Sequence, residues 1–381
     1  MAQNPEATVV FGVLNETSET ESRVALTPDI VTRLKRSGVS SLIEAGAGIA
    51  ADYTDEDYEK AGAKVTSREA DALGFVDRPS AETVAKLKAG QWVIGMLGSF
   101  TDADYVAALE KAGLVGIAIE KLPRKLSSAQ SMDEMTSQNS VMGYKAAITA
   151  ADAYGSFLPM MTTAAGTIRP AKALVLGAGI AGLQAIGTLK RLGAVVTAYD
   201  VRPASQGEVE SLGAKFLDLG LDFSKGQGEG GYARALSAEE QAQQQAAVDE
   251  KAAGFDIIIT TAKVPGRKPP VLLTAAGVKG LKRGAVIVDC AASDLGGNVE
   301  GSAVGEQVTE GGVKLIGAPY LASGVATTAS NLLSRNVADI LVHFVRDGKL
   351  GQDLTEELDD ALVVAGRAAA PAAADAEKSE K

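Results

Sequence analysis

Short apolar runs alternate with amphipathic stretches in the first third of the chain. The apolar run at residues 8–14 predicts a strand, and the run at 42–44 predicts a second one. Between them, Thr27 followed by Pro28 predicts the start of a helix that continues to about Ser37, because threonine is a good N-cap and proline fits the first helical turn. The alternation continues through residues 54–61, 81–88, 92–97, 102–112 and 115–119. This order of strands and helices indicates βαβ units and a parallel sheet.

A second pattern of the same kind begins at Lys172. Before it, a helical stretch at 137–158 leads into residues 162–166, and we interpret both as the connector between two domains. The predicted strands are 173–176, 195–199, 256–261, 285–290 and 314–316, and the predicted helices include 182–192 and 330–345. The strands are apolar runs that suit a sheet buried on both faces. We therefore predict an α/β fold with two Rossmann-like, doubly wound parallel-sheet domains.

The predicted domain boundaries follow from the same pattern. A chain of 381 residues is too long for one ordinary core. We expect the last helix to pack back on the first domain, which then comprises residues 1–136 and 326–365, while 137–325 form the nucleotide-binding domain. Residues 220–254 are rich in glycine and then in alanine and glutamine, which indicates mobility near Gly231 and Tyr232. The alanine, proline and charged residues of 366–381 predict a disordered tail.

The composition narrows the possible partners and compartments. Hydrophobic residues make up 46% of the chain, and the formal net charge of −11 argues against nucleic acid or an anionic membrane surface as a partner. The one cysteine, Cys290, allows no internal disulfide and suits a reducing compartment. No uninterrupted apolar stretch reaches the roughly 20 residues that span a bilayer, and the N-terminus has no apolar signal core. These features predict a soluble, cytoplasmic chain, and no metal site is expected.

A glycine-rich turn follows the predicted strand at 173–176. Gly177, Gly179 and Gly182 fit the pattern G-x-G-x-x-G between a strand and a helix. In this pattern the first glycine allows the tight turn, the second lets the backbone approach a pyrophosphate, and the third lets helix and strand pack closely. The phosphates then lie at the positive end of the helix. The turn therefore predicts a dinucleotide site.

The residue that ends the next strand indicates which dinucleotide is bound. Asp200 lies at about the 20-residue spacing at which an acidic side chain binds the adenosine ribose hydroxyls. Its charge would repel a 2′-phosphate and so favours NAD(H), although Arg202 is a signal in the opposite direction. Asp289 also ends a strand, and it either contacts the ligand or holds its own loop. The candidate nucleotide-binding residues of this region are Gly177, Ala178, Gly179, Ile180, Gly182, Asp200, Val201, Arg202 and Asp289.

Several motifs, in the same order along the chain, resemble the alanine dehydrogenase/transhydrogenase family. They lie at residues 23–28, 122–133, 143–146, 160–167, 177–185, 230–233, 260–262, 265–266 and 296–298. The segment 122–133 resembles the loop that the soluble NAD(H)-binding component of proton-translocating transhydrogenase places against the nicotinamide. The resemblance covers most of the chain. It adds Gly231, Tyr232, Thr261 and Ala262 as nucleotide-binding residues.

The resemblance also implies roles in hydride transfer for residues of the segment 122–133. Gln130 corresponds to the glutamine that hydrogen-bonds the nicotinamide ribose. Asp133 corresponds to an aspartate that helps to hold the nicotinamide end and the NADP(H) of a partner. Arg124 follows a proline, as the arginine of the family does, whereas Lys125 has the family's spacing to the glutamine. Both are candidates for this role, although a lysine cannot form the two-pronged hydrogen bonds of an arginine.

The main alternative is an alanine-dehydrogenase-like NAD-dependent oxidoreductase. Oxidation of an amino acid needs a general acid or base, and in that enzyme a histidine and a lysine of the first domain serve the substrate. The corresponding stretches here, 74–79 and 96–100, contain neither, and the single histidine, His343, lies on the predicted last helix. Arg23 either binds a carboxylate, as its counterpart does in alanine dehydrogenase, or pairs with Glu16 or Glu21, and we favour the ion pair.

Hydride transfer between two nicotinamides needs no acid or base, only two rings held with reacting atoms about 3–3.5 Å apart. We therefore predict direct hydride transfer between NAD(H) on this chain and NADP(H) on a partner subunit. The resemblance implies a homodimer, membrane-spanning and NADP(H)-binding partner subunits, proton translocation by the assembly, and a peripheral place at the cytoplasmic face of the membrane. A third possibility is a nucleotide-sensing module that binds NADH without transferring hydride.

Overall fold

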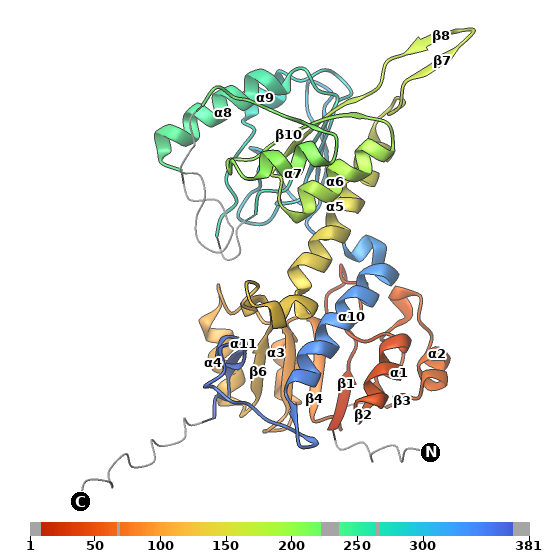
Figure 1. Ribbon diagram of the computed structural model, residues 1–381, viewed down its shortest axis with the longest axis vertical. Helices are drawn as coiled ribbons and strands as arrows, with labels where there is room; N and C mark the ends of the chain where they lie inside the picture. The colour runs from red at the N-terminus through yellow and green to blue at the C-terminus, as the bar shows by residue number, and fades with distance from the viewer. Residues whose placement is uncertain (1–8, 67–68, 222–235, 264–266, 369–381) are drawn as a thin grey trace, which may run out of the picture. The chain divides into compact units, whose positions relative to one another are not determined.

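The computed structural model describes residues 9–66, 69–221, 236–263 and 267–368. It divides into two compact units: unit 1 consists of residues 1–137 and 326–381, and unit 2 of residues 138–325. Each unit is built on one seven-stranded sheet with helices packed against it (Figure 1). The predicted α/β class with two doubly wound sheets is confirmed.

The sheet of unit 1 has the strand order β18-β6-β5-β4-β1-β2-β3. Its strands are β1 (Val9–Val13), β2 (Val39–Ile43), β3 (Lys64–Val65), β4 (Ala72–Asp77), β5 (Trp92–Met96), β6 (Val115–Ala118) and β18 (Val363–Ala365). Strands β1 to β6 are parallel, and the chain runs outward from β1 to β3 before it returns to β4 on the other side of β1. This reversal is the switch point of a doubly wound sheet. Strand β18 is antiparallel to β6 and was not predicted.

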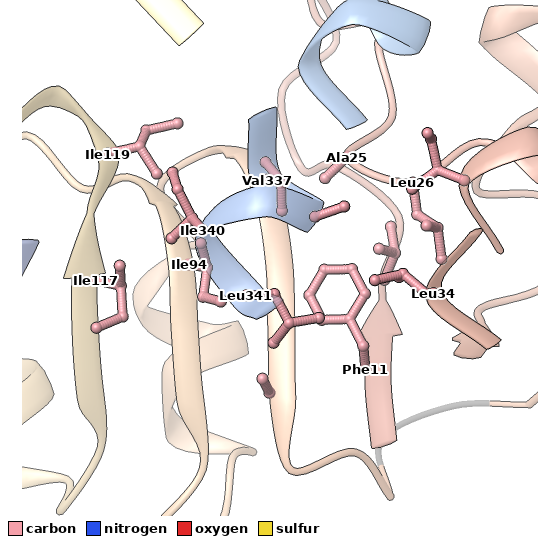
Figure 2. Packing of buried hydrophobic residues seen from close by; sticks show 14 of the residues in the cluster. Phe11, Ala25, Leu26, Leu34, Ile94, Ile117, Ile119, Val337, Ile340 and Leu341 are labelled. Atoms are coloured by element: carbon pink, nitrogen blue, oxygen red, sulfur yellow. The ribbon is translucent and has the colours of Figure 1, made fainter. Parts of the chain in front are cut away.

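Helix α10 belongs to the core of unit 1. The helices of this unit are α1 (Pro28–Arg36), α2 (Asp55–Ala61), α3 (Ala81–Ala85), α4 (Ala103–Lys111), α10 (Ala326–His343) and α11 (Glu357–Leu362). Figure 2 shows Val337, Ile340 and Leu341 of α10 packed beside Phe11 of β1 and Ile94 of β5. All five side chains are completely buried. Since each contributes about 1.5–3 kcal/mol when fully buried, α10 is firmly attached to this sheet.

The sheet of unit 2 has the strand order β11-β10-β9-β12-β13-β15-β14. Its strands are β9 (Lys172–Leu176), β10 (Val195–Tyr199), β11 (Lys215–Phe216), β12 (Ile257–Thr260), β13 (Val286–Asp289), β14 (Gly305–Val308) and β15 (Lys314–Gly317). The helices that follow its strands are α6 (Ile180–Arg191), α7 (Ser205–Ser211), α8 (Ala238–Ala252) and α9 (Ala275–Lys279). All strands are parallel except β14, which is antiparallel to β15. The switch point lies between β9 and β12, where the glycine turn begins.

The predicted helix at 137–158 is displaced toward the N-terminus. Helix α5 runs over Glu134–Ala153. It begins early because the carboxylate of Asp133 accepts the N–H of Thr136 at 2.9 Å, which is the N-capping hydrogen bond of its first turn. It ends early because Gly155 and Pro159 follow, and neither favours a continued helix.

Two further expectations need correction. Residues 162–166, predicted as part of a connector, belong to a hairpin of strands β7 (Met161–Thr163) and β8 (Gly166–Ile168), which extends away from the rest of unit 2 (Figure 1). Thr27 precedes α1 as predicted, but its side chain does not cap the helix. Its hydroxyl instead donates to the hydroxyl of Ser334 at 3.5 Å, and its N–H donates to the same oxygen at 3.0 Å, because α10 lies close to this segment.

Some predicted features lie outside the described residues. These are the loop with Gly231 and Tyr232 and most of the predicted disordered tail, residues 369–381. Within the described ranges, no helix is both long enough and apolar enough to cross a membrane.

Candidate functional site

The turn after β9 brings strand and helix together by close backbone contacts. Gly177 has a φ of +99°, which residues with a side chain rarely adopt, and its N–H donates to the carbonyl of Tyr199 at 2.8 Å. A Cβ on Gly182 would lie 1.8 Å from the carbonyl oxygen of Gly177. Both positions therefore require glycine, one for the turn and one for helix packing.

Gly179 differs from these two glycines because it faces open space. A Cβ at this position would meet nothing within 4 Å. The residue directly precedes α6, whose first N–H groups have no intrahelical partner and carry partial positive charge. Ile180, the first residue of α6, is half-buried, whereas Ala178 is fully buried and supports the turn. The open space and the helix N-terminus fit a phosphate group of a dinucleotide.

Asp200, at the end of β10, is tied to this turn. Its Oδ2 accepts the N–H of Ala178 at 2.8 Å. Arg202 donates from Nε to Oδ1 and from Nη2 to Oδ2, both at 2.9 Å, and this hydrogen bonding raises the pKa of Arg202 above its usual value. The half-buried Val201 lies between the two in sequence. Asp200 therefore positions the turn, and Arg202 neutralises the charge of the carboxylate.

The loop after β12 contacts the same turn. The hydroxyl of Thr261 donates to the carbonyl of Gly177 at 2.9 Å. The carbonyl of Ala262 accepts from Nδ2 of Asn298 at 2.8 Å, and the same nitrogen donates to the carbonyl of Pro270 at 2.8 Å. Asn298 is completely buried. Backbone groups at the carboxyl ends of β9, β10 and β12 thus meet at the switch point, the usual ligand position in such sheets.

Asp289 has a structural role in this arrangement. Its carboxylate accepts hydrogen bonds from Oγ1 of Thr260 at 2.9 Å, from the N–H of Ala291 at 2.9 Å and from the N–H of Val299 at 3.1 Å. The residue has no exposed surface. A Cβ on Gly297 would lie 2.1 Å from its Oδ2, so the loop is packed directly against the carboxylate. These contacts favour the prediction that Asp289 holds its own loop over the prediction that it contacts the ligand.

In unit 1, Arg124, Asp133 and Thr136 form a closed network at the start of α5. Arg124 donates from Nε to Oδ2 of Asp133 at 2.9 Å and from Nη2 to Oγ1 of Thr136 at 3.0 Å. Thr136 in turn donates from Oγ1 to Oδ2 of Asp133 at 2.6 Å. Since Arg124 is the cation bound to Asp133, the structure favours it over the exposed Lys125 for the arginine role.

Gln130 lies on a short 3-10 helix just before this network. The helix, η3, covers Ser127–Met132, and the side chains of Ala129 and Met132 are buried beneath it. Gln130 itself is exposed, so its amide is accessible to a ligand. The sequence-predicted residues Arg124, Gln130 and Asp133 are thus brought together on one short stretch of unit 1.

Arg23 forms the predicted ion pair with a neighbouring acid. It donates from Nε to Oε1 of Glu21 at 2.8 Å and from Nη2 to Oε2 at 2.6 Å. Burial acts to lower the pKa of Arg23, but the hydrogen bond to Glu21 and its charge outweigh this effect and raise it. The guanidinium is therefore already engaged by a carboxylate of its own chain.

Two further carboxyl groups near Arg23, those of Glu134 and Glu16, have strongly raised pKa values. Burial raises the pKa of Glu134 to about 7, against the positive charge of Arg23, and the charges of Asp133 and Glu120 raise it further. Burial raises the pKa of Glu16 to about 8, although its Oε1 accepts the N–H of Val76 at 2.7 Å. Near neutral pH both carboxyl groups are therefore partly protonated.

The single histidine has structural contacts. Nε2 of His343, at the end of α10, lies 2.5 Å from Oδ1 of Asp359 in α11. Asp359 is completely buried and also accepts from Nη2 of Arg346 at 2.9 Å and from the N–H of Asp353 at 2.6 Å. His343 thus fastens α10 to α11.

The two doubly wound sheets, with a G-x-G-x-x-G turn at the switch point of unit 2, define the chain as a dinucleotide-binding α/β protein. Sequence comparison identifies the family. Residues 12–142 match the N-terminal domain, and residues 146–368 the C-terminal domain, of the family described as alanine dehydrogenase/PNT. The chain belongs to this family, which binds nicotinamide nucleotides.

The relatives of this chain include both transhydrogenase subunits and alanine dehydrogenases, and the transhydrogenase subunits are more similar to it. Two proteins named as the first part of NAD(P) transhydrogenase subunit alpha, from Rickettsia prowazekii and Rhodospirillum rubrum, are 40% and 41% identical to this chain, covering 89% and 90% of it and 91% of each relative. The crystal structure of a transhydrogenase from Sinorhizobium meliloti matches with a TM-score of 0.83 at 41% identity, over 93% of this chain and 98% of that one. Alanine dehydrogenase of Mycolicibacterium smegmatis is more distant, at 29% identity over 77% of this chain and 75% of that enzyme.

Two residues that support the site were not predicted. Thr136 was missed because the helix was expected to start at residue 137, three residues later than it does, although an aspartate just before a helix is a recognisable N-cap signal. Asn298 lay within a motif but was assigned no role. Its contacts with Ala262 and Pro270 depend on chain segments that are distant in sequence.

Proposed function

We propose that this chain is the NAD(H)-binding component of a proton-translocating nicotinamide nucleotide transhydrogenase. In this proposal, NAD(H) bound by the chain exchanges a hydride directly with NADP(H) held on a partner subunit. Its support is the identity of about 40% to relatives named as transhydrogenase subunits, together with the fit of the glycine turn to a dinucleotide.

The observation that carries the proposal is the engagement of Arg23 by Glu21. An enzyme that oxidises an amino acid needs a free cation for the substrate carboxylate. Here the guanidinium of Arg23 is bound at 2.6 Å and 2.8 Å by Glu21 of its own chain. Hydride exchange between nicotinamides needs no such cation.

The residues of unit 2 fit the dinucleotide as follows. The N-terminus of α6 and the space beside Gly179 would hold the pyrophosphate, and Ile180 and Ala262 would flank it. Asp200 would bind the adenosine ribose, for which Arg202 must release at least one of its carboxylate oxygens. Gly231 and Tyr232 would contact the nucleotide from their loop, and Thr261 would keep the turn in place.

The residues of unit 1 would act on the nicotinamide end. Gln130 would hydrogen-bond the nicotinamide ribose, while Arg124 and Asp133 would orient the nicotinamide end and the NADP(H) of the partner. When bound, the nicotinamide nucleotides supply and accept the hydride, and the chain contributes only orientation and exclusion of water. Direct transfer balances because NADH loses one hydride and NADP⁺ gains it, with no proton released.

The proposal includes partners. We infer a homodimer that assembles with an NADP(H)-binding subunit and a membrane-spanning subunit, so that the chain is peripheral to the cytoplasmic face of the membrane. The β7–β8 hairpin supports the dimer, since an isolated two-stranded hairpin is marginally stable in water and this one is largely exposed. A second copy would cover it.

A comparison of two assays tests the proposed function. The purified chain with its NADP(H)-binding partner should reduce the thionicotinamide analogue of NADP⁺ at the expense of NADH. The chain should be inert with NADH, ammonia and pyruvate. Oxidation of NADH that depends on pyruvate would instead support an alanine-dehydrogenase-like enzyme, and tight NADH binding without any transfer would support a nucleotide sensor.

A further inference from the structure

One side chain of α10, Asn336, holds the segment that carries Gln130. Its Nδ2 donates to the carbonyl oxygen of Ser131 at 2.8 Å. Its Oδ1 accepts from the hydroxyl of Ser137 at 2.7 Å. Ser131 directly follows Gln130 in η3, and Ser137 lies in the first turn of α5, after Asp133. The two hydrogen bonds of Asn336 therefore hold the residue that follows Gln130 and a residue of the helix that Asp133 caps.

Asn336 lies on a firmly packed helix, whereas the segment that it holds, η3, is only weakly ordered by its own hydrogen bonds. Asn336 is only 8% exposed, and the neighbouring Val337 is completely buried in the core shown in Figure 2. The segment it holds is a 3-10 helix of six residues, a geometry with poorer hydrogen bonds than an α-helix. Buried amide hydrogen bonds are strong when fully satisfied. Asn336 thus supplies order that η3 lacks by itself.

We propose that Asn336 is a positioning residue for hydride transfer. It touches neither the nucleotide nor the reacting atoms, and it acts by fixing Gln130 relative to Asp133. This inference rests on the proposed function. Because hydride transfer requires the reacting atoms to be about 3–3.5 Å apart, a misplacement of about 1 Å costs on the order of 100-fold in rate.

Ser334 provides a matched control on the same helix. Its hydroxyl accepts the N–H of Thr27 at 3.0 Å, and the side chain is completely buried. It therefore makes a buried hydrogen bond between α10 and the backbone of another segment, as Asn336 does. Its partner segment, however, does not carry Gln130 or Asp133. A purely structural role for Asn336 predicts the same effects for both substitutions.

The experiment compares Asn336→Ala and Ser334→Ala in the complex with the NADP(H)-binding partner. We expect both variants to lower the thermal unfolding midpoint by similar amounts. Only Asn336→Ala should lower kcat for hydride transfer from NADH to the thionicotinamide analogue of NADP⁺, by about tenfold or more. The KM for NADH should stay within about twofold of the wild type.

Two further variants separate the effects of the two hydrogen bonds that Asn336 makes with Ser131 and Ser137. Asn336→Asp keeps an acceptor for Ser137 but places an oxygen against the carbonyl of Ser131, so it should lose as much kcat as Asn336→Ala. Ser137→Ala removes the other hydrogen bond of Asn336, together with the bond of Ser137 to the carbonyl of Glu134 at 3.0 Å, and should lose less kcat. If Asn336→Ala does not fold, Asn336→Asp and Ser137→Ala test the proposal in its place.

The outcomes distinguish the two proposals. An active wild-type complex with an equally active Asn336→Ala variant would overturn this inference alone. A loss of kcat matched by Ser334→Ala would also overturn it, because the effect would then be general destabilisation. A wild-type complex that transfers no hydride would overturn the proposed function, and this inference with it.

Discussion

Arg124 donates from Nε to Oδ2 of Asp133 at 2.9 Å, across the segment that carries Gln130. The pair joins a residue that precedes η3 to the residue that caps α5, with Thr136 bonded to both. The ends of the segment are thereby held at a fixed separation. Orienting groups of this kind are what direct hydride transfer requires from a protein.

The first prediction concerns the choice between Arg124 and Lys125. Arg124→Ala should lower the rate of hydride transfer by roughly 10- to 100-fold, because Asp133 loses its cationic partner. The stability loss should be at most about 1 kcal/mol, since the pair is partly exposed to solvent. Steady-state transfer rates in the complex measure the effect. Lys125→Ala is the control and should retain the wild-type rate within about twofold; a reversed order would assign the role to Lys125.

The second prediction uses two glycines of the same turn. Gly179→Ala should fold normally, because its Cβ would enter open space, yet it should weaken NADH binding at least tenfold because the methyl group would occupy the proposed phosphate position. Gly182→Ala should instead destabilise unit 2, because its Cβ would lie 1.8 Å from the carbonyl oxygen of Gly177. NADH fluorescence titration and thermal unfolding distinguish these effects.

Gly187, which lies about one and a half turns further along α6 than Gly182, serves as the control for Gly179 and Gly182. Gly187→Ala meets only the end of the Arg191 side chain, at 3.4 Å, and should stabilise the helix slightly, by up to about 1 kcal/mol. Unchanged NADH affinity in Gly179→Ala would show that no phosphate lies at this position.

The third prediction concerns pH. Burial raises the pKa of Glu134 from 4.5 to about 7 in the folded chain. Between these values the folded state binds more protons than the unfolded state, so the contribution of Glu134 to stability falls as pH rises and is constant above about 7. Glu134→Gln keeps the shape and removes the titration. It should therefore be more stable than the wild type at pH 8, by up to about 3 kcal/mol at about 1.4 kcal/mol per pKa unit.

Denaturant unfolding at pH 5 and pH 8 measures this difference. The gap between Glu134→Gln and the wild type should be much smaller at the lower pH, where Glu134 is protonated in the folded state and partly protonated in the unfolded state. A gap that is larger at pH 5 than at pH 8 would contradict the sign. Glu16, with a pKa of about 8, acts in the same direction and is present in both proteins of the comparison.

The fourth prediction concerns the C-terminal part of unit 1. Asp359→Asn should destabilise the fold by about 2 kcal/mol, because a completely buried carboxylate loses its ion pair with Arg346 and its hydrogen bond with His343 is weakened. This is less than the roughly 3–5 kcal/mol of a fully buried pair, since the side chains of Arg346 and His343 keep some contact with water. The exposed pair of Glu56 and Lys60 is the control: Lys60→Ala should change stability by at most about 0.5 kcal/mol. Equal effects of the two substitutions in thermal unfolding would refute the structural role of Asp359.

The features that could be predicted from the sequence are those with local causes. The turn at Gly177 and Gly182 was predictable because the glycines, the strand before them and the helix after them are contiguous. The helix after Pro28 was predictable for the same reason. Strands β14 and β18 were not, because each is an edge strand that pairs antiparallel with a single neighbour, and that neighbour is set by the tertiary fold.

The candidate site shows the same limit. Spacing alone left Arg124 and Lys125 as alternatives, and the ion pair of Arg124 with Asp133 is found only in the three-dimensional structure. From the sequence, Arg202 was interpreted only as a signal against NAD(H). Its hydrogen bonds to both carboxylate oxygens of Asp200 are found only in the three-dimensional structure. Asn336 could not be found from sequence, because its partners Ser131 and Ser137 lie far away along the chain.

The most direct test of the central claim follows the hydrogen itself. NADH that carries deuterium at the transferred position of C4 is supplied to the complex with NADP⁺, and the product is analysed by mass spectrometry. Direct transfer predicts that the deuterium is recovered in NADPH, with none released to water. Loss of the label to solvent, or oxidation of the labelled NADH only when pyruvate and ammonia are present, would contradict the account.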